Sequence, residues 1–168
     1  TRLVREVSRE ARKIRPGIKV SAAIYGDWES ARISVAQDAA AWIDEGLLDF
    51  ICPMNYTAST EKFVHLLQKQ LAHVQNRIPV YPGIGIHLLP DAAAVAEQIM
   101  LSRKHGADGF LCFQHTADFA DRILPGLRQG VSSLTVTEPL PHHGSPLKIK
   151  LHASQAGLPA GFYSLSEP

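Results

Sequence analysis

Polar and aromatic side chains follow four short apolar runs of the sequence, each at the point where the run ends. They fall in residues 25–29, 54–57, 85–87 and 114–116. Carboxylates and amides hydrogen-bond hydroxyl groups, and aromatic rings stack on the apolar faces of small molecules. The inventory therefore suits a polar small molecule such as a sugar. The candidate site residues are Tyr25, Asp27, Trp28, Glu29, Asn55, Tyr56, His87, Gln114 and His115.

The four apolar runs recur with a period of about thirty residues, a signature of repeated structural units. They begin at Ile18, Leu48, Pro79 and Asp108. Runs of this length and composition predict strands of a parallel sheet covered on both faces. Patterns with helical spacing precede, separate and follow them. The expected helices span residues 3–14, 34–45, 63–74, 91–105 and 116–127.

Local signals predict where the second helix begins and where the second and fourth helices end. Ser34 and Gln37 have the spacing of a capping box, which predicts that the second helix begins there. Gly46 is positioned to end the second helix in the left-handed conformation, and Gly106 is positioned to end the fourth helix in the same way.

Strict alternation of strands and helices predicts an α/β fold with a parallel sheet and right-handed crossovers. A (β/α)8 barrel needs about 250 residues in eight such units. Four strands in 168 residues, preceded by a helix, predict the C-terminal half of a TIM barrel, strands five to eight. An open doubly wound sheet is the alternative, although no GxGxxG motif follows any strand to suggest dinucleotide binding.

Composition divides the chain into three parts and limits its partners. We expect a half-barrel over residues 1–130, a Pro-rich linker over 131–146 and a tail over 147–168 with one strand at 147–153. The net charge of +1 and the absence of a long apolar stretch argue against nucleic-acid binding and a transmembrane segment. Cys52 and Cys112 lack metal-site spacing, and we expect no metal or cofactor.

The middle of the chain resembles the glycosyl-hydrolase-like 10 proteins, a family of bacterial (β/α)8 barrels. Residues 37–56 are similar to the family's pattern of a Trp-bearing helix, a Gly turn, an Asp-Phe strand start and a polar-Tyr strand end. Residues 18–28, 81–86 and 106–110 fit its strand five and its last two strands. The resemblance covers about residues 1–127 and does not extend to the tail.

The resemblance implies an exported barrel that acts on or binds a polysaccharide. It implies that Asn55 and Tyr56 line the sugar cleft, with Tyr25 and Trp28 beside them. Many barrel glycosidases carry glutamates at the ends of strands four and seven. The strand-seven position here reads Gly85-Ile86-His87, so the two-glutamate mechanism is not supported.

Two functions stay open, and an isomerase or aldolase is a weaker third because no lysine ends a strand. As a glycoside hydrolase, the chain would use Asp27 or Glu29 as general acid or base, with a partner group upstream of Thr1. As a carbohydrate-binding barrel it would lack catalysis. A half-barrel also leaves its two edge strands unpaired, so we expect homodimers or aggregation through them.

Overall fold

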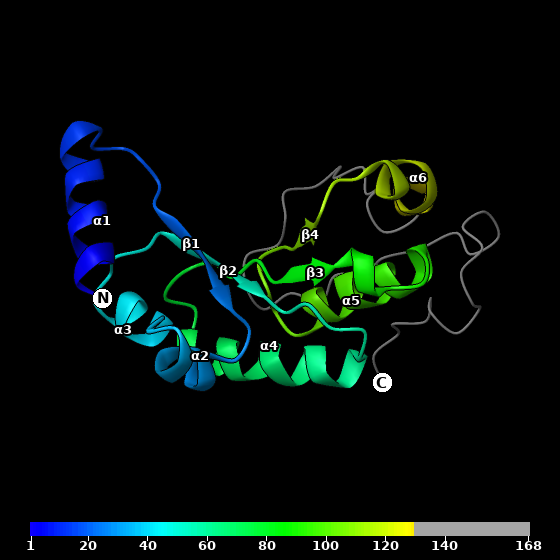
Figure 1. Cartoon of the computed structure of the whole chain (residues 1–168), viewed down its shortest axis with the longest axis horizontal. Coiled ribbons are helices and arrows are strands. Elements are labelled where there is room, and N and C mark those ends of the chain that lie inside the picture. Colours follow the sequence, from blue (N-terminus) through cyan, green and yellow to red (C-terminus); the bar gives the residue numbers. More distant parts are fainter. Residues whose placement is uncertain (130–168) are drawn as a thin grey trace.

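The computed structural model describes residues 1–129, which form an α/β fold around one parallel sheet (Figure 1). The sheet order, β1-β2-β3-β4, is the order of the strands in the chain. Every neighbouring pair is parallel. The α/β class and the alternation of strands with helices predicted from the sequence are confirmed. The strands are β1 (Ser21–Tyr25), β2 (Phe50–Met54), β3 (Gly83–Gly85) and β4 (Leu111–Phe113).

Six α-helices accompany the sheet in the described part of the chain. Ser59 and Asp91 cap α4 and α5, because each side chain accepts a hydrogen bond from the backbone N–H three residues further on. Gly46 and Gly106, with φ of 65° and 86°, end α3 and α5 as predicted. The helices are α1 (Arg2–Ile14), α2 (Trp28–Ser34), α3 (Ala39–Asp44), α4 (Thr60–Val74), α5 (Ala92–Lys104) and α6 (Leu124–Gln129). A 3-10 turn (Ile86–Leu88) follows β3, and a π-helical turn (Phe119–Ile123) leads into α6.

The segment between β1 and β2 differs from the single helix that the sequence predicted. It holds two short helices, α2 and α3, each capped by its own aspartate, Asp27 and Asp38. Ala36 adopts a positive φ of 55°, which breaks the helical path between them. The predicted capping box is wrong, because the Ser34 hydroxyl donates back to Ser30 O within α2 and Gln37 bonds to β1.

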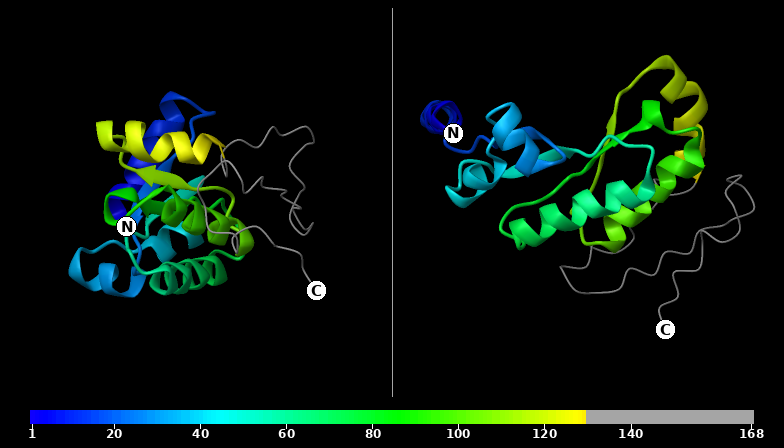
Figure 2. Two further views of the ribbon diagram at one scale, coloured as in Figure 1. Left: turned by 90° about the vertical axis from the view of Figure 1, so that its right-hand side faces the viewer. Right: turned by 60° about the horizontal axis from the view of Figure 1, so that its bottom comes forward.

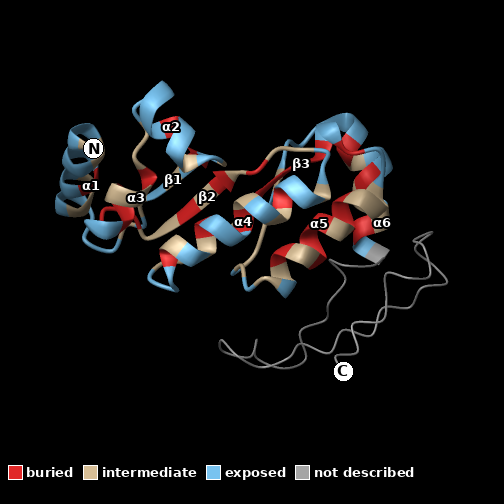
Figure 3. Ribbon diagram, turned by 90° about the horizontal axis from the view of Figure 1, so that it is seen from below, coloured by how far each residue is buried: buried red, intermediate tan, exposed pale blue. Residues whose placement is uncertain are grey.

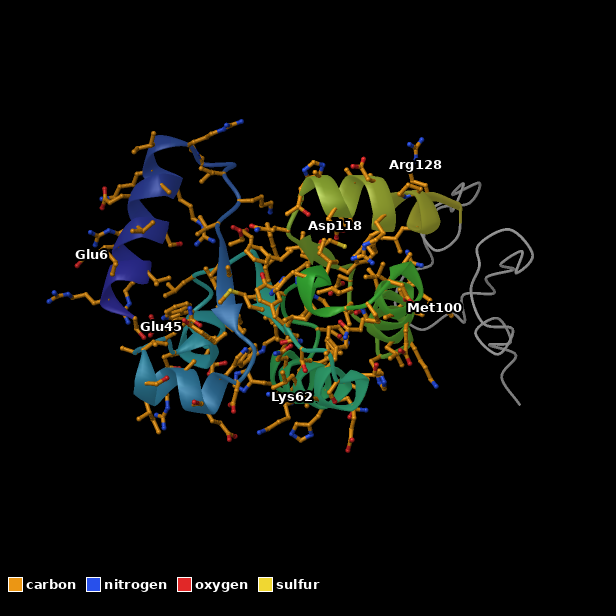
Figure 4. The ribbon with its side chains drawn as sticks, turned by 45° about the vertical axis from the view of Figure 1, so that its right-hand side comes forward. Glu6, Glu45, Lys62, Met100, Asp118 and Arg128 are labelled. Atoms are coloured by element: carbon orange, nitrogen blue, oxygen red, sulfur yellow. The ribbon has the colours of Figure 1, made fainter. Side chains whose placement is uncertain are left out.

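Helices α3, α4, α5 and α6 pack on one face of the sheet. One core cluster joins α3 and the end of α4 to Ile24 and Ile51, and a second joins α4, α5 and α6 to Ile84. Neighbouring helices contact each other around this face, α4 with α5 and α5 with α6 (Figure 2). Both α4 and α5 carry their buried residues on the inner side (Figure 3). At the end of α3, Glu45 accepts hydrogen bonds of 2.8 and 2.9 Å from Arg5 of α1 (Figure 4).

The opposite face of the sheet carries no helix among residues 1–129. We call it the bare face. Tyr25, Leu111 and Phe113 are 51, 46 and 43% exposed on it. The apolar runs predicted cover on both faces, and the described chain supplies cover on only one. The strand residues of the bare face are Ser21, Ala23, Tyr25, Phe50, Cys52, Met54, Gly83, Gly85, Leu111 and Phe113.

The outer edge of β1 is partly closed by a side chain. Gln37 Oε1 accepts a hydrogen bond of 2.6 Å from Tyr25 N, and Gln37 Nε2 donates to Ala23 O at 3.4 Å. One residue of a parallel strand would bond the same two backbone groups. The Gln37 amide therefore ends strand pairing at the carboxyl end of this edge. The predicted linker and tail, residues 131–168, lie outside the described residues.

Candidate functional site

The structure brings Tyr56 and His87 together with Phe113, a residue that the sequence analysis did not select. We call these three the aromatic cluster, and they lie at the carboxyl ends of β2, β3 and β4. The Tyr56 and Phe113 rings stack, with centroids 5.0 Å apart and planes 17° apart. His87 meets both rings edge-on, at 6.2 Å from Tyr56 and 6.0 Å from Phe113. The Phe113 ring could have been found from strand alternation, because Leu111 and Phe113 share one face of β4.

Two glycines of β3 make room for the Tyr56 ring. A Cβ at Gly83 would lie 2.9 Å from Tyr56 Cε1, and a Cβ at Gly85 would lie 2.9 Å from Tyr56 Cβ and 3.2 Å from its backbone Cα. Because β3 has no side chain at these two positions, Tyr56 can lie directly across the β3 backbone. Alternate glycines in the strand Gly83–Gly85 are the sequence signal for this close approach.

Burial raises the pKa of the Tyr56 phenol above its ordinary value of 10, and a negative charge on the nearby Cys52 raises it further. The neutral hydroxyl can donate a hydrogen bond at neutral pH. His87 Nδ1 lies 3.4 Å from Phe113 O, which joins the turn after β3 to the end of β4. The aromatic cluster thus combines flat apolar rings with two polar tips, a combination that suits the face of a sugar.

Asn55 lies beneath this edge rather than on its surface. Its side chain is fully buried. Asn55 Nδ2 donates to Gln70 Oε1 at 3.0 Å, and Gln70 Nε2 donates to Asn55 Oδ1 at 2.7 Å. Gln70 Nε2 also lies 2.8 Å from Gly26 O, so α4, β2 and the end of β1 are joined at one point. In this position Asn55 holds the strand ends in place.

Asp27, Trp28 and Glu29 lie on α2 and at its start, and they face α4. Asp27 Oδ1 accepts from Ser30 N at 3.3 Å as the helix cap. The Glu29 side chain is 83% exposed, and its Oε2 lies 3.4 Å from Lys69 Nζ. Trp28 meets His73 edge-on with ring centroids 5.6 Å apart. Both carboxylate side chains are exposed to solvent.

The remaining candidates lie near the aromatic cluster or on the bare face. Tyr25 is exposed at the carboxyl end of β1, in register with Met54. Gln114 and His115 follow β4 and are exposed, and the His115 ring lies 6.1 Å from that of Phe119. The structure therefore divides the predicted site. One group belongs to the strand ends and consists of Tyr25, Tyr56, His87, Gln114 and His115. The other group faces a pocket between helices and consists of Asp27, Trp28 and Glu29.

Comparisons with known protein families and with curated proteins found no match for this chain. In the part that the structure describes, no helix is both long and apolar enough to cross a membrane. Across residues 1–129, no three His, Cys, Asp or Glu side chains gather in a way that would hold a metal ion.

Proposed function

We propose that this chain forms part of a glycoside-hydrolase-like (β/α)8 barrel and binds a polysaccharide at the carboxyl ends of its strands. The observation that carries the proposal is the aromatic cluster, where Tyr56 stacks on Phe113 beside His87. Ligand sites of parallel α/β folds form at this end of the strands. The exposed Phe113 ring there offers the flat apolar surface that sugar rings need, and the polar tips of Tyr56 and His87 reach hydroxyl groups.

The arrangement of the sheet supports a barrel rather than an open doubly wound sheet. A doubly wound sheet reverses its strand order at one point and carries helices on both faces. Here the order β1-β2-β3-β4 has no reversal, and the helices of both core clusters cover one face. Further parallel strands would close this sheet into a cylinder and enclose the bare face. We infer that another β/α segment or a second copy of the chain supplies them.

The described residues support a binding function better than a catalytic one. Glycoside hydrolysis needs two carboxyl groups across the scissile bond. The aromatic cluster contains no carboxylate, and Asp27 and Glu29 face α4. Hydrolysis stays a second candidate because both carboxylates adjoin Trp28. Under hydrolysis, Asp27→Asn or Glu29→Gln lowers turnover far more than binding, and unchanged turnover in both variants removes them from the mechanism.

Affinity electrophoresis of the chain in gels that contain single soluble polysaccharides tests the binding proposal. We expect at least one polysaccharide to retard the chain, and Phe113→Ala to weaken the retardation about tenfold, as the loss of one stacked ring predicts. Ile33→Ala is the matched control, because Ile33 is an exposed apolar residue on α2 that does not belong to the aromatic cluster. Equal retardation of the Phe113 variant and the control, or none across the series, would overturn the proposal. The implied export can be checked by fractionating the producing cell.

A further inference from the structure

A pocket of about 210 Å³ lies between α2, α3 and α4, apart from the aromatic cluster. It has room for roughly seven water molecules. The α4 residues that line it are spaced for one helix face, and they include Leu66, Lys69 and Gln70. Trp28 and Arg32 line it from α2, while the start of α3 supplies small alanines. The whole lining is Gly26, Asp27, Trp28, Glu29, Arg32, Asp38, Ala39, Ala40, Leu66, Lys69, Gln70 and His73.

The charges that line this pocket nearly cancel. Lys69 and Glu29 pair with each other at 3.4 Å. Asp27 and Asp38 each accept a backbone N–H as helix caps, which uses part of their acceptor capacity. The Arg32 guanidinium makes no hydrogen bond to any residue that the structure describes. A strongly anionic ligand would meet three carboxylates, and a cationic ligand would meet Arg32 and Lys69, so a neutral ligand is favoured.

One polar group of the lining is left unsatisfied. Trp28 Nε1 is buried without a hydrogen bond, whereas His73 Nε2 lies 3.5 Å from Asp44 Oδ1, outside the lining. Buried polar atoms are normally paired, so the indole N–H calls for a partner. Hydroxyl groups both donate and accept, so one small ligand can satisfy an indole N–H and a carboxylate together.

We propose that this pocket binds a small neutral polyhydroxylated molecule, the size of a single sugar unit, against the Trp28 ring. Its hydroxyl groups bond to Trp28 Nε1, to Arg32 and to the free acceptor positions of Asp27 or Glu29, and Leu66 and the α3 alanines contact its apolar face. The inference does not need the barrel or the aromatic cluster, because every lining residue lies on β1's carboxyl end, α2, α3 or α4.

The two tryptophans of the chain allow a direct test. Trp42 is buried in the core and does not line the pocket, so Trp42→Phe leaves Trp28 as the only indole reporter. The fluorescence of this variant is titrated with methyl glucoside, methyl galactoside and N-acetylglucosamine. Glucuronate and glucosamine serve as anionic and cationic counterparts. The same titrations are repeated with Arg32→Gln added, and with Phe113→Ala added.

We expect at least one neutral sugar to change the Trp28 emission saturably, with a Kd of about 1 to 10 mM. Arg32→Gln should weaken that sugar several-fold, whereas Phe113→Ala should leave it unchanged. No saturable change with any neutral sugar, or tighter binding of glucuronate or glucosamine, would overturn the inference. Loss of binding in the Phe113 variant would overturn it too, by assigning the sugar to the aromatic cluster. One combination of results would reject this pocket alone. If a polysaccharide retards the chain through Phe113 but no sugar changes the Trp28 emission, the pocket proposal is wrong and the proposed function is supported.

Discussion

The amides of Asn55 and Gln70 bond to each other in both directions, at 3.0 and 2.7 Å, in the interior of the protein. Asn55 directly follows β2, and Gln70 lies in the third turn of α4. Because Gln70 also donates to Gly26 O, this pair fixes the ends of two strands against one helix. The position of the candidate site therefore depends on two buried, uncharged polar residues.

Gln70→Met tests the contribution of this pair to folding. Methionine fills a similar volume and removes every hydrogen bond, so the buried Asn55 amide loses its partner. We expect the free energy of unfolding to fall by about 1–3 kcal/mol, measured by urea denaturation. Gln68→Met, at an exposed position of the same helix, is the control and should change stability little. Equal effects of the two substitutions would contradict the role of the pair.

Gly26→Ala tests the close approach beside the same pair. A Cβ at Gly26 would lie 2.8 Å from Asn55 Oδ1 and 3.2 Å from Met54 O, a backbone atom that cannot easily move. We expect a loss of about 1–3 kcal/mol from overpacking, seen as a lower thermal midpoint in circular dichroism. Gly17→Ala is the matched control, since nothing lies within 4 Å of its added Cβ. An unchanged thermal midpoint in the Gly26 variant would show that the strand ends can move apart to accommodate the Cβ.

Asp49 should make stability depend on acid pH. Its Oδ2 accepts from Val20 N at 2.8 Å and from Arg12 at 3.1 Å. The backbone hydrogen bond, with help from Arg12 and Lys19, lowers the pKa of Asp49 below its ordinary 3.8. A carboxyl with a lowered folded-state pKa stabilises the protein above the unfolded-state value. That contribution is lost as the pH falls from 3.8 through the lower folded-state value.

Asp49→Asn should therefore be less stable than the parent protein at neutral pH, and the difference should narrow below pH 3.8. Urea denaturation at both pH values measures it. Asp121→Asn is the control, because Asp121 is exposed and makes no ion pair with any residue in 1–129. A difference for Asp49→Asn that stays constant with pH would contradict the assignment.

The two cysteines should differ in reactivity. Burial raises the pKa of the Cys112 thiol to about 11, and it raises the pKa of Cys52 by a smaller amount. Because the thiolate is the reacting form, a thiol reagent at neutral pH should modify both slowly and Cys112 last. Mass spectrometry of time points, with urea-unfolded protein as the control, measures the order. Faster labelling of Cys112 would show that β4 opens more readily than β2.

The bare face should make this chain self-associate when no other strands cover it. Leu111 and Phe113 leave an apolar surface beside the edge of β4, which pairs with no second strand among residues 1–129, and such surfaces promote association. Sedimentation velocity should show dimers or larger species at micromolar concentration. Leu111→Lys should shift them toward monomer, because it places a charge on the bare face. Ile33→Lys on α2 is the control and should leave the distribution of species unchanged. A parent protein that is monomeric at this concentration would contradict the prediction.

Local sequence determined most of the elements of this fold. The thirty-residue period located β1 to β4, and Gly46 and Gly106 marked helix ends that the structure confirms, because caps and turns depend on near neighbours. Contacts between distant residues decided the site. Gln37 bonds β1 rather than capping a helix, Asn55 is buried against Gln70, and Phe113 reaches Tyr56 across β3. Each of these depends on strand register and on the packing of α4, which hydrophobic periodicity does not encode.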